Sequence, residues 1–266
     1  LPFAGTRRPH PDSLDRCRPC GDDTGPRQRL GGLSQPHALE TALHPNKPVD
    51  TLRGPSRPHP MNIQIAELAA ERLPETAELL TDVFLNLEPM TAALRLPRDF
   101  YAAYVRAVCD HCFADHLAVA ALDADVDRVV GVAIGLDDGK YRQTLHVIPP
   151  EYRAAMEQMN DFFEELDKPL ARLPGKFSFV FYLVVVRSYW RAGISLAMLA
   201  RLESLLRAKR YDYLVSEATN PKSEGAFRKQ GYVELNRRPY AAPGKSGAAP
   251  FAAIPGDCTL FVKKLG

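Results

Sequence analysis

Residues 176–209 read KFSFVFYLVVVRSYWRAGISLAMLARLESLLRAK, and this stretch decides the fold. Its first part, 176–186, is the most apolar segment of the chain, which is typical of a strand covered on both faces of a sheet. A long amphipathic helix is predicted over 193–209, because apolar residues recur there at helical spacing. They are Leu196, Leu199, Ala200, Leu202 and Leu206. The stretch is therefore a buried strand that turns directly into a helix.

The segments on either side alternate between strand and helix patterns, which indicates a mixed α/β chain. Upstream, the sequence predicts strands over 61–66, 117–122 and 128–136 and helices over 72–85, 99–113 and 151–166. Downstream, it predicts a strand over 211–218, a helix over 222–230, and strands over 231–236 and 258–263. A Pro/Gly/Ala-rich loop is expected at 239–255, before the last strand.

Composition excludes two broad classes of function. The chain has 266 residues, with 34 Lys and Arg against 32 Asp and Glu, and this near balance argues against a wholesale nucleic-acid binder. No apolar run approaches the roughly 18 residues of a membrane-spanning helix, the longest candidate being 177–186. We therefore expect neither a nucleic acid nor a membrane as partner.

The first 60 residues differ in composition from the rest. They hold 11 of the 23 prolines and one aromatic residue, Phe3, so they cannot bury enough apolar surface to fold. We expect a disordered tail at 1–60, ahead of one domain at 61–266. The first Met is Met61, where strand-like alternation begins. We therefore interpret the tail as the result of a translation start assigned too far upstream, with Met61 as the expected start. A targeting peptide is the alternative, but the tail has no apolar central region.

Five cysteines are present, and four of them form two Cys-x-x-Cys pairs. Cys17 and Cys20 lie in the tail, whereas Cys109 and Cys112 lie at helical spacing in the predicted helix 99–113. Four thiolates can bind zinc, but the pairs are far apart in the sequence, so packing of Cys109 and Cys112 as small apolar groups is favoured. We expect no metal. The odd cysteine count and the lack of a signal peptide indicate a cytoplasmic, reducing compartment.

The turn between the central strand and the long helix is a candidate ligand site. The first turn of such a helix presents free N–H groups and the positive end of its dipole, which suits a phosphate. Gly193 allows close approach of a ligand to the backbone, Ser195 adds a hydroxyl and Arg191 adds charge. The alternative is that Gly193 is only a packing or capping residue.

About 25 residues further on, the segment 216–232 reads SEATNPKSEGAFRKQGY. Together the two segments resemble the GNAT family of acetyl-CoA-dependent N-acetyltransferases. The family's pyrophosphate loop, Gln/Arg-x-x-Gly-x-Gly/Ala, matches 190–195, and its later Asn, Ser and Gly-Phe/Tyr positions match Asn220, Ser223 and 231–232. Two residues depart from the loop pattern: Trp190 replaces the Gln or Arg, and Ser195 replaces the last small residue.

The resemblance covers most of 61–266 and implies the fold. That fold is a mixed, mostly antiparallel central sheet with helices on both faces and splayed central strands. It also implies acetyl-CoA as co-substrate, with the thioester carbonyl bound by backbone groups exposed at the splay. The residues implied for coenzyme binding are Val184, Val185, Val186, Trp190, Arg191, Ala192, Gly193, Ile194, Ser195, Asn220 and Ser223.

A narrower resemblance lies at 83–96, VFLNLEPMTAALRL, which is similar to the Phe-x-x-x-Glu-Pro-Leu-x-x-x-Leu signature of insect-type arylalkylamine N-acetyltransferases. This subgroup implies Glu88 as the general base, with a solvated carboxylate at a helix end as the alternative. It also implies Ser223, with Thr219 as its companion, for stabilising the leaving thiolate. Phe227 stands where many GNAT enzymes have a proton-donating Tyr, and Ser223 could instead cap a helix.

The function expected is transfer of acetyl to the primary amine of a small molecule by direct attack in a ternary complex, in a monomer or homodimer. Aromatic candidates for the acceptor pocket are Phe84, Tyr101, Phe162 and Tyr240, and acidic ones are Glu164, Glu165 and Asp167. The histidines match no motif, and Cys258 and Cys109 are weaker candidates for a covalent route. The alternatives are a GNAT domain that binds CoA or a protein without catalysis, and a protein N-acetyltransferase.

Overall fold

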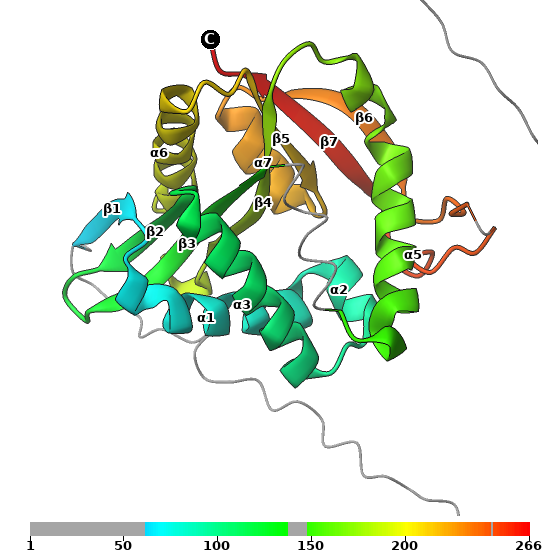
Figure 1. Cartoon of the computed structure of the whole chain (residues 1–266), viewed down its shortest axis with the longest axis horizontal. Coiled ribbons are helices and arrows are strands. Elements are labelled where there is room, and N and C mark those ends of the chain that lie inside the picture. The colour runs from blue at the N-terminus through cyan, green and yellow to red at the C-terminus, as the bar shows by residue number, and fades with distance from the viewer. Residues whose placement is uncertain (1–61, 138–147, 246) are drawn as a thin grey trace, which may run out of the picture. The chain divides into compact units, whose positions relative to one another are not determined.

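The computed structural model describes residues 62–137, 148–245 and 247–266, and the structural statements below refer to them (Figure 1). The described residues all belong to one unit, 46–266. The predicted tail at 1–60, with Cys17 and Cys20, lies outside the described residues. Among the described helices, none combines the length and apolar character that crossing a membrane would require.

Seven strands form one sheet in the order β1-β2-β3-β4-β5-β7-β6. Neighbouring strands are antiparallel except β4 and β5, which are parallel, so the predicted mixed and mostly antiparallel sheet is confirmed. The strands are β1 (Ile63–Glu67), β2 (Ala118–Asp123), β3 (Arg128–Asp137), β4 (Phe177–Val185), β5 (Tyr213–Ala218), β6 (Val233–Pro239) and β7 (Asp257–Lys264).

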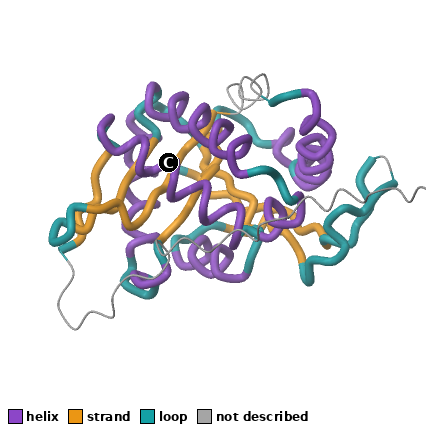
Figure 2. Tube along the Cα trace, turned by 90° about the horizontal axis from the view of Figure 1, so that it is seen from below, coloured by secondary structure: helices purple, strands orange, loops and turns teal. Residues whose placement is uncertain are grey.

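Helices cover both faces of this sheet, as predicted (Figure 2). On one side, α1 and α3 pack against each other and against β2 and β3, while α6 packs on β1 to β4 from the other side. The α-helices are α1 (Leu73–Leu87), α2 (Pro89–Leu94), α3 (Arg98–Ala114), α5 (Pro150–Leu166), α6 (Ile194–Ala208) and α7 (Pro221–Lys229). Short 3-10 helices are η2 (Ala70–Arg72), η4 (Lys168–Arg172) and η5 (Arg187–Tyr189).

Close packing of α6 on the sheet fixes where that helix begins. A Cβ added at Gly131 on β3 would lie 3.0 Å from Met198 Cε of α6, so the glycine makes room for the helix. Met198, Leu199, Leu202 and Leu206 are fully buried at this interface. Because β4 and the inner face of α6 are both packed in the core, the turn between them is held at both ends.

The two central parallel strands separate along their length. Pairing joins only Phe177–Phe179 of β4 to Tyr213–Val215 of β5. Beyond this point β4 stays paired with β3 as far as Val185, and β5 stays paired with β7 as far as Ala218. Each strand thus follows its outer neighbour, and the edge of β4 that faces β5 loses its strand partner. The predicted splay of the central strands is confirmed.

Candidate active site

The turn that leads from β4 into α6 is anchored in the core. Tyr189 is buried, and its hydroxyl donates a hydrogen bond to Asp123 Oδ2 at the end of β2, at 2.7 Å. Arg191 and Gly193 both adopt left-handed backbone angles, with φ of 68° and 77°. A Cβ at Gly193 would meet no atom within 4 Å, so the glycine is required for its φ angle and leaves open space above it.

The first turn of α6 is open to an anion. No described side chain caps this helix, so the N–H groups at its start have no side-chain acceptor. Arg187, Arg191, Ala192 and Gly193 are exposed beside it, and Ile194 is buried as the first helical residue. The helix dipole and the two guanidinium groups therefore favour negative charge at this end of α6.

The backbone groups of Val184, Val185 and Val186 do not all face the splay. Val186 donates its N–H to the Val130 carbonyl at 2.8 Å and accepts from Tyr189, so both of its groups are occupied. Because successive residues of a strand turn their backbone groups to opposite sides, Val185 faces away from β3 and toward the gap, unlike Val184. The Val185 carbonyl accepts a hydrogen bond from Trp190 Nε1 at 2.7 Å.

Asn220 caps the helix that follows β5. Its side chain accepts from the N–H groups of Lys222 and Ser223, both at 3.1 Å. The Ser223 hydroxyl in turn donates to the Asn220 carbonyl at 2.8 Å. The capping interpretation is thus confirmed for Asn220, whereas the role of Ser223 toward a thiolate stays a prediction. The carbonyl of Thr219, just before the cap, accepts a hydrogen bond from the Tyr240 hydroxyl at 2.7 Å.

Phe227, at the position where many GNAT enzymes have a proton-donating Tyr, belongs to the core. Its ring lies 5.1 Å from that of Tyr232 and 5.9 Å from that of Phe261, and only 2% of the residue is exposed. A hydroxyl at this position would point into apolar surroundings. The structure therefore offers no acid from this turn of α7.

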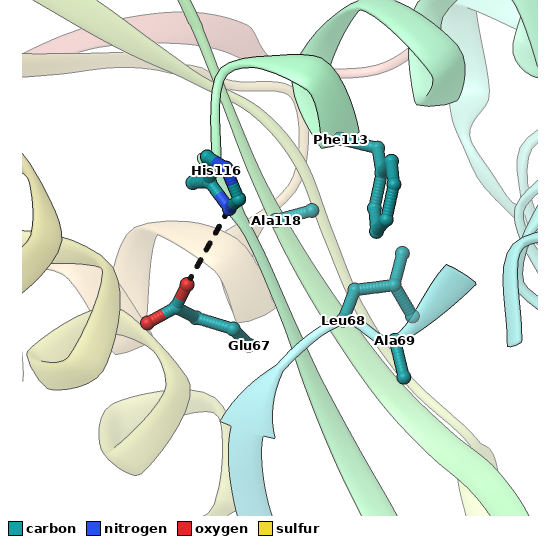
Figure 3. A pocket seen from close by; sticks show the side chains of 6 residues that line it. All are labelled: Glu67, Leu68, Ala69, Phe113, His116 and Ala118. Carbon is teal, nitrogen blue, oxygen red and sulfur yellow. Dashed lines mark ion pairs between the residues drawn. The ribbon is translucent and has the colours of Figure 1, made fainter. Parts of the chain in front are cut away.

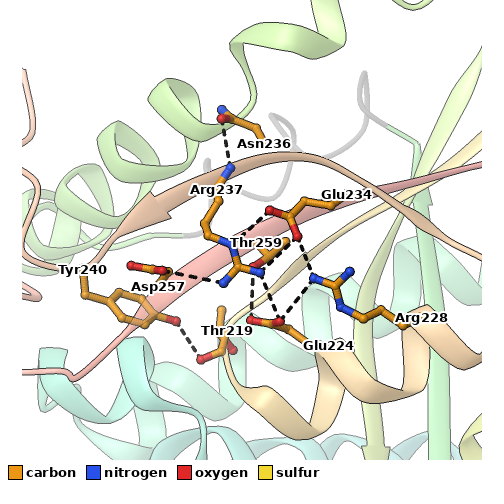
Figure 4. Close-up of polar contacts among 9 residues, drawn as sticks. All are labelled: Thr219, Glu224, Arg228, Glu234, Asn236, Arg237, Tyr240, Asp257 and Thr259. Carbon is orange, nitrogen blue, oxygen red and sulfur yellow. Dashed lines mark hydrogen bonds and ion pairs between the residues drawn. The ribbon is translucent and has the colours of Figure 1, made fainter.

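An ion-pair network orients α7 on β6 and β7 (Figure 4). Arg237 of β6 contacts Glu234 at 3.0 Å and Glu224 of α7 at 3.3 Å, and Arg228 of α7 contacts Glu234 at 2.6 Å. The two guanidinium groups lower the pKa of Glu234 to about 2. Thr259 of β7 adds a hydrogen bond to Glu224 at 3.1 Å. These contacts are partly exposed and contribute little to stability, but they fix the direction of α7.

Glu88 lies at the junction of α1 and α2 and caps α2 with both carboxylate oxygens. Oε1 accepts from Met90 N–H at 3.1 Å and Oε2 from Thr91 N–H at 2.6 Å. The charge of Glu88 helps to raise the pKa values of Tyr101 on α3, Tyr240 and Cys258 on β7. Glu88 therefore lies near groups from distant parts of the chain. Two backbone donors thus hold the carboxylate still, and each oxygen keeps a lone pair for a water or an amine.

Two further groups lie on the β5–β7 side of the site. Cys258, which the sequence indicates only as a weaker candidate for a covalent route, is affected by the charge of Glu88, and no motif marks Glu217 of β5. Glu217 lies opposite Leu260 of β7 and interacts with the Cys258 thiol and with the Asp167 side chain. Burial raises the pKa of Glu217 to about 7, and the hydrogen bond with Asp167 opposes this only in part. A carboxylate in an otherwise apolar strand was the signal available in the sequence.

Burial raises the pKa of the Cys258 thiol well above its usual range, and the carboxylates of Glu217, Glu88 and Asp167 add to the effect. The thiol is therefore protonated at neutral pH and is a poor nucleophile. Cys109 is buried too, with a pKa raised to about 12, so neither cysteine supports a covalent route. Cys109 and Cys112 pack in the core, which confirms the expectation for that pair. Within the described ranges, no three His, Cys, Asp or Glu residues form a metal-binding group.

The predicted acceptor-side aromatics gather in two clusters. Phe162 of α5 stacks on Tyr240 at 5.7 Å between ring centres and meets Phe251 edge-on at 5.6 Å, so the loop before β7 packs against α5. Phe84 of α1 meets Tyr182 of β4 at 4.6 Å, and Tyr182 interacts with the Tyr101 hydroxyl. Of the acidic candidates, Glu164 pairs with Lys245 and Glu165 with Lys168 at the surface. Asp167 alone joins the group around Cys258.

A shallow depression lies elsewhere, between the end of β1 and the junction of α3 with β2 (Figure 3). There His116 Nδ1 lies 3.9 Å from the Glu67 carboxylate, which also pairs with Arg201 of α6 at 2.9 Å. Leu68, Ala69, Phe113 and Ala118 complete its lining. None of the predicted site residues lines this depression.

Comparison with known proteins places the fold. No protein-family model and no curated protein sequence matches the chain significantly. Among solved structures, arylalkylamine N-acetyltransferase 2 of Aedes aegypti aligns at a TM-score of 0.62 and 16% identity, over 77% of this chain and 100% of the other. The polyamine N-acetyltransferase of Drosophila melanogaster, which forms N-acetylagmatine, aligns at 0.64 and 14% identity, over 76% and 100%.

The C-terminal condensation domain of Ebony, solved with β-alanyl-dopamine, aligns at a TM-score of 0.63 and 16% identity, over 77% of this chain and 99% of the other. At such identities the likeness concerns the fold. The seven-stranded sheet, the splay of β4 from β5 and the open start of α6 agree with it. The chain therefore has the fold of the GNAT acetyltransferases, and solved arylalkylamine and polyamine N-acetyltransferases share this fold.

Proposed function

We propose that this protein is an N-acetyltransferase that moves the acetyl group of acetyl-CoA to the primary amine of a small molecule. The observation that carries the proposal is the gap that opens between β4 and β5 beyond Phe179 and Val215. At its mouth lies the open N-terminus of α6, and on the side of α1 to α3 lies Glu88. The proposal takes the open start of α6, the edge of β4 that has no strand partner and the fixed carboxylate of Glu88 to serve one coenzyme and its acceptor amine.

The residues around the gap fit the coenzyme. The start of α6, with Arg187 and Arg191, supplies N–H donors and positive charge for a pyrophosphate. The edge of β4 at Val185, whose carbonyl accepts from Trp190 in the free protein, supplies backbone groups for the amide-bearing arm that carries the thioester. Bound acetyl-CoA supplies the activated acetyl group. Donors held in place by the sheet stabilise an oxyanion on the thioester carbonyl at little cost of reorganisation.

Glu88 is the general base in this proposal. An alkylammonium group with a pKa of about 10 must lose a proton before its nitrogen can attack a carbonyl carbon. The carboxylate receives this proton, directly or through one water. The N–H groups of Met90 and Thr91 hold it in one orientation throughout. The nitrogen then forms its bond to the carbonyl carbon, the carbon–sulfur bond breaks, and the electron pair leaves with the sulfur.

The departing thiolate is stabilised by the N-terminus of α7. That helix begins after Asn220, and its dipole favours negative charge at Thr219 and Ser223. The Ser223 hydroxyl donates to the Asn220 carbonyl in the free protein and would turn toward the sulfur to act as the proton donor that the resemblance implies. Phe227 provides no alternative acid, because it lies in the core. The nitrogen, positively charged after its attack, then loses its second proton, which passes through Ser223 or through solvent to the thiolate, so that a neutral amide and a thiol remain.

The acceptor side favours a small amine over a protein. The stacking of Phe162 on Tyr240 and Phe251 joins α5 to the loop before β7, and the Lys245–Glu164 ion pair adds a second link between them. An open groove for a peptide would require these segments to stand apart. The solved neighbours include enzymes for arylalkylamines and agmatine, which supports a small-molecule amine as acceptor.

The rival is a domain that keeps the fold and binds a ligand without catalysis. Two observations favour it: Trp190 hydrogen-bonds the β4 carbonyl that faces the gap, and Phe227 replaces a Tyr. Binding of acetyl-CoA without turnover on any amine would support this rival.

The test measures acetyl-CoA binding by calorimetry and thiol release over a panel of arylalkylamines, polyamines and aminoglycosides. Glu88→Gln should lower kcat/KM by about 100-fold, the lower end of the range for a lost general base, and leave the dissociation constant of acetyl-CoA unchanged. Glu157→Gln, at an exposed position of α5, is the matched control and should have the kcat/KM of the wild type. Unchanged kcat/KM in Glu88→Gln would leave Glu88 as a helix cap only.

A further inference from the structure

Trp190 and Lys222 contact each other across the end of the β4–β5 gap. Trp190 belongs to the turn that follows β4, and Lys222 to the first turn of α7, which follows β5. The Lys222 Nζ lies 4.0 Å from the centre of the Trp190 ring, a cation–π contact, and the Arg187 guanidinium carbon lies 5.7 Å from it. We call this contact the Trp190–Lys222 strap. The strap therefore joins the turn that follows β4 to the helix α7 that follows β5, although β4 and β5 themselves have separated.

The strap also occupies the edge of β4. Trp190 Nε1 donates to the Val185 carbonyl at 2.7 Å, and Val185 turns its backbone groups toward the gap. The indole N–H therefore takes the position that an amide N–H of a bound chain would occupy along this edge. Trp190 is nevertheless 39% exposed, so its ring is held by these polar contacts and not by burial in the core.

Positively charged side chains lie at the Trp190–Lys222 strap, and these could bind an anionic ligand. Arg187 and Lys222 both lie close to the centre of the indole ring, at 5.7 Å and 4.0 Å, and Arg191 is exposed next to the open start of α6. A cation–π contact at an exposed site is worth only about 0.5–1 kcal/mol, whereas a phosphate offers a full charge and several hydrogen bonds. An incoming phosphate can thus exchange favourably with the indole for Lys222.

We propose that the Trp190–Lys222 strap fills the coenzyme site in the free protein and is displaced by the coenzyme when it binds. An amide N–H of the ligand's arm replaces the indole N–H at the Val185 carbonyl, and a phosphate replaces the indole ring at Lys222. Trp190 thereby makes binding depend on a ligand that carries both groups. The inference rests on the proposed function, because it takes the gap to be the coenzyme site.

Trp190 is the single tryptophan of the chain, so its fluorescence reports directly on the strap. The full-length protein is titrated with coenzyme A, with pantetheine and with ADP, in parallel by calorimetry and by emission. Coenzyme A should shift the emission and increase quenching by acrylamide, because the indole leaves its two partners. ADP has phosphates without the amide arm and should leave the Val185 hydrogen bond, and hence most of the emission, unchanged.

Two variants test the exchange itself. Trp190→Phe keeps an aromatic ring but removes the N–H, and it should tighten coenzyme A binding by about 2- to 10-fold, the factor expected for one competing hydrogen bond. Lys222→Met should change the emission of the free protein and weaken coenzyme A binding more than pantetheine binding. Lys229→Met, an exposed lysine on the same helix, is the matched control and should change neither.

Coenzyme A binding in the calorimeter without any change in emission or quenching would overturn the inference and leave the proposed function intact. So would weaker coenzyme A binding by Trp190→Phe, which would make the indole a fixed contact of the bound ligand. Absence of coenzyme A binding would instead refute the proposed function itself. The two failures are therefore distinguishable.

Discussion

Replacing Glu217 by Gln should make the protein less sensitive to pH. Burial raises the pKa of Glu217 from its usual 4.5 to about 7, and hydrogen bonds with Asp167 and with the backbone oppose this only in part. The folded protein therefore holds a proton that the unfolded chain releases between these two values. The contribution of Glu217 to stability is therefore greatest below pH 4.5 and decreases as the pH rises through about 7, the opposite of a carboxylate with an ion-pair partner.

The size of this effect follows from the two pKa values. Each tenfold difference in proton affinity is about 1.4 kcal/mol, so the wild type should lose about 2–3 kcal/mol of unfolding free energy to Glu217 between about pH 5 and about pH 8. The Gln side chain is neutral throughout and can still donate a hydrogen bond to Asp167. Its variant should therefore equal or exceed the wild type in stability above neutral pH.

Urea unfolding of wild type and Glu217→Gln across this pH range measures the difference between the two slopes. Glu234→Gln is the control, because the pKa of Glu234 is lowered to about 2 by Arg237 and Arg228 and it does not titrate in the window. Parallel curves for wild type and Glu217→Gln would show that the Glu217 carboxyl is solvated, and would refute its placement in a partly buried acidic group beside Cys258.

Three further changes test the parts that position the site. Asn220→Ala removes the cap of α7 and should lower the unfolding free energy by about 1 kcal/mol in urea titrations, while no loss would contradict the capping assignment. Tyr189→Phe removes the donor to buried Asp123 and should cost about 1–3 kcal/mol and weaken acetyl-CoA binding in calorimetry; unaltered binding would show that the turn holds its shape without this anchor. Gly193→Ala should cost about 1 kcal/mol through its left-handed φ alone, and thermal unfolding at the wild-type temperature would contradict that reasoning.

Much of the fold could be predicted because its decisive segments are long and strongly patterned. The apolar run at 177–185 and the amphipathic helix at 194–208 lie where the sequence predicts them. The insertion of β7 between β5 and β6 depends on pairing between residues distant in sequence, which periodicity alone does not encode. The helix α2 was not predicted, since its six residues are too few for a periodic pattern and begin at the proline after Glu88.

The candidate site was predictable only where a motif marks it. Gly193, Asn220 and Glu88 stand at recognisable positions, and the structure gives each a clear local role at a helix end. The grouping of Glu217, Asp167 and Cys258 comes from three separate segments that meet only in the folded chain. The strap could not be foreseen either, because Trp190 reads in the sequence as a departure from the loop pattern and its partners Val185 and Lys222 are set by geometry.

The most direct test of the central claim is mass spectrometric detection of the N-acetylated amine after incubation with acetyl-CoA and each member of the amine panel. The account predicts an acetylated product from at least one small amine, in amounts equal to the thiol released, and a large loss of that product in Glu88→Gln. Acetyl-CoA that binds but yields no acetylated amine from any member of the panel would contradict it.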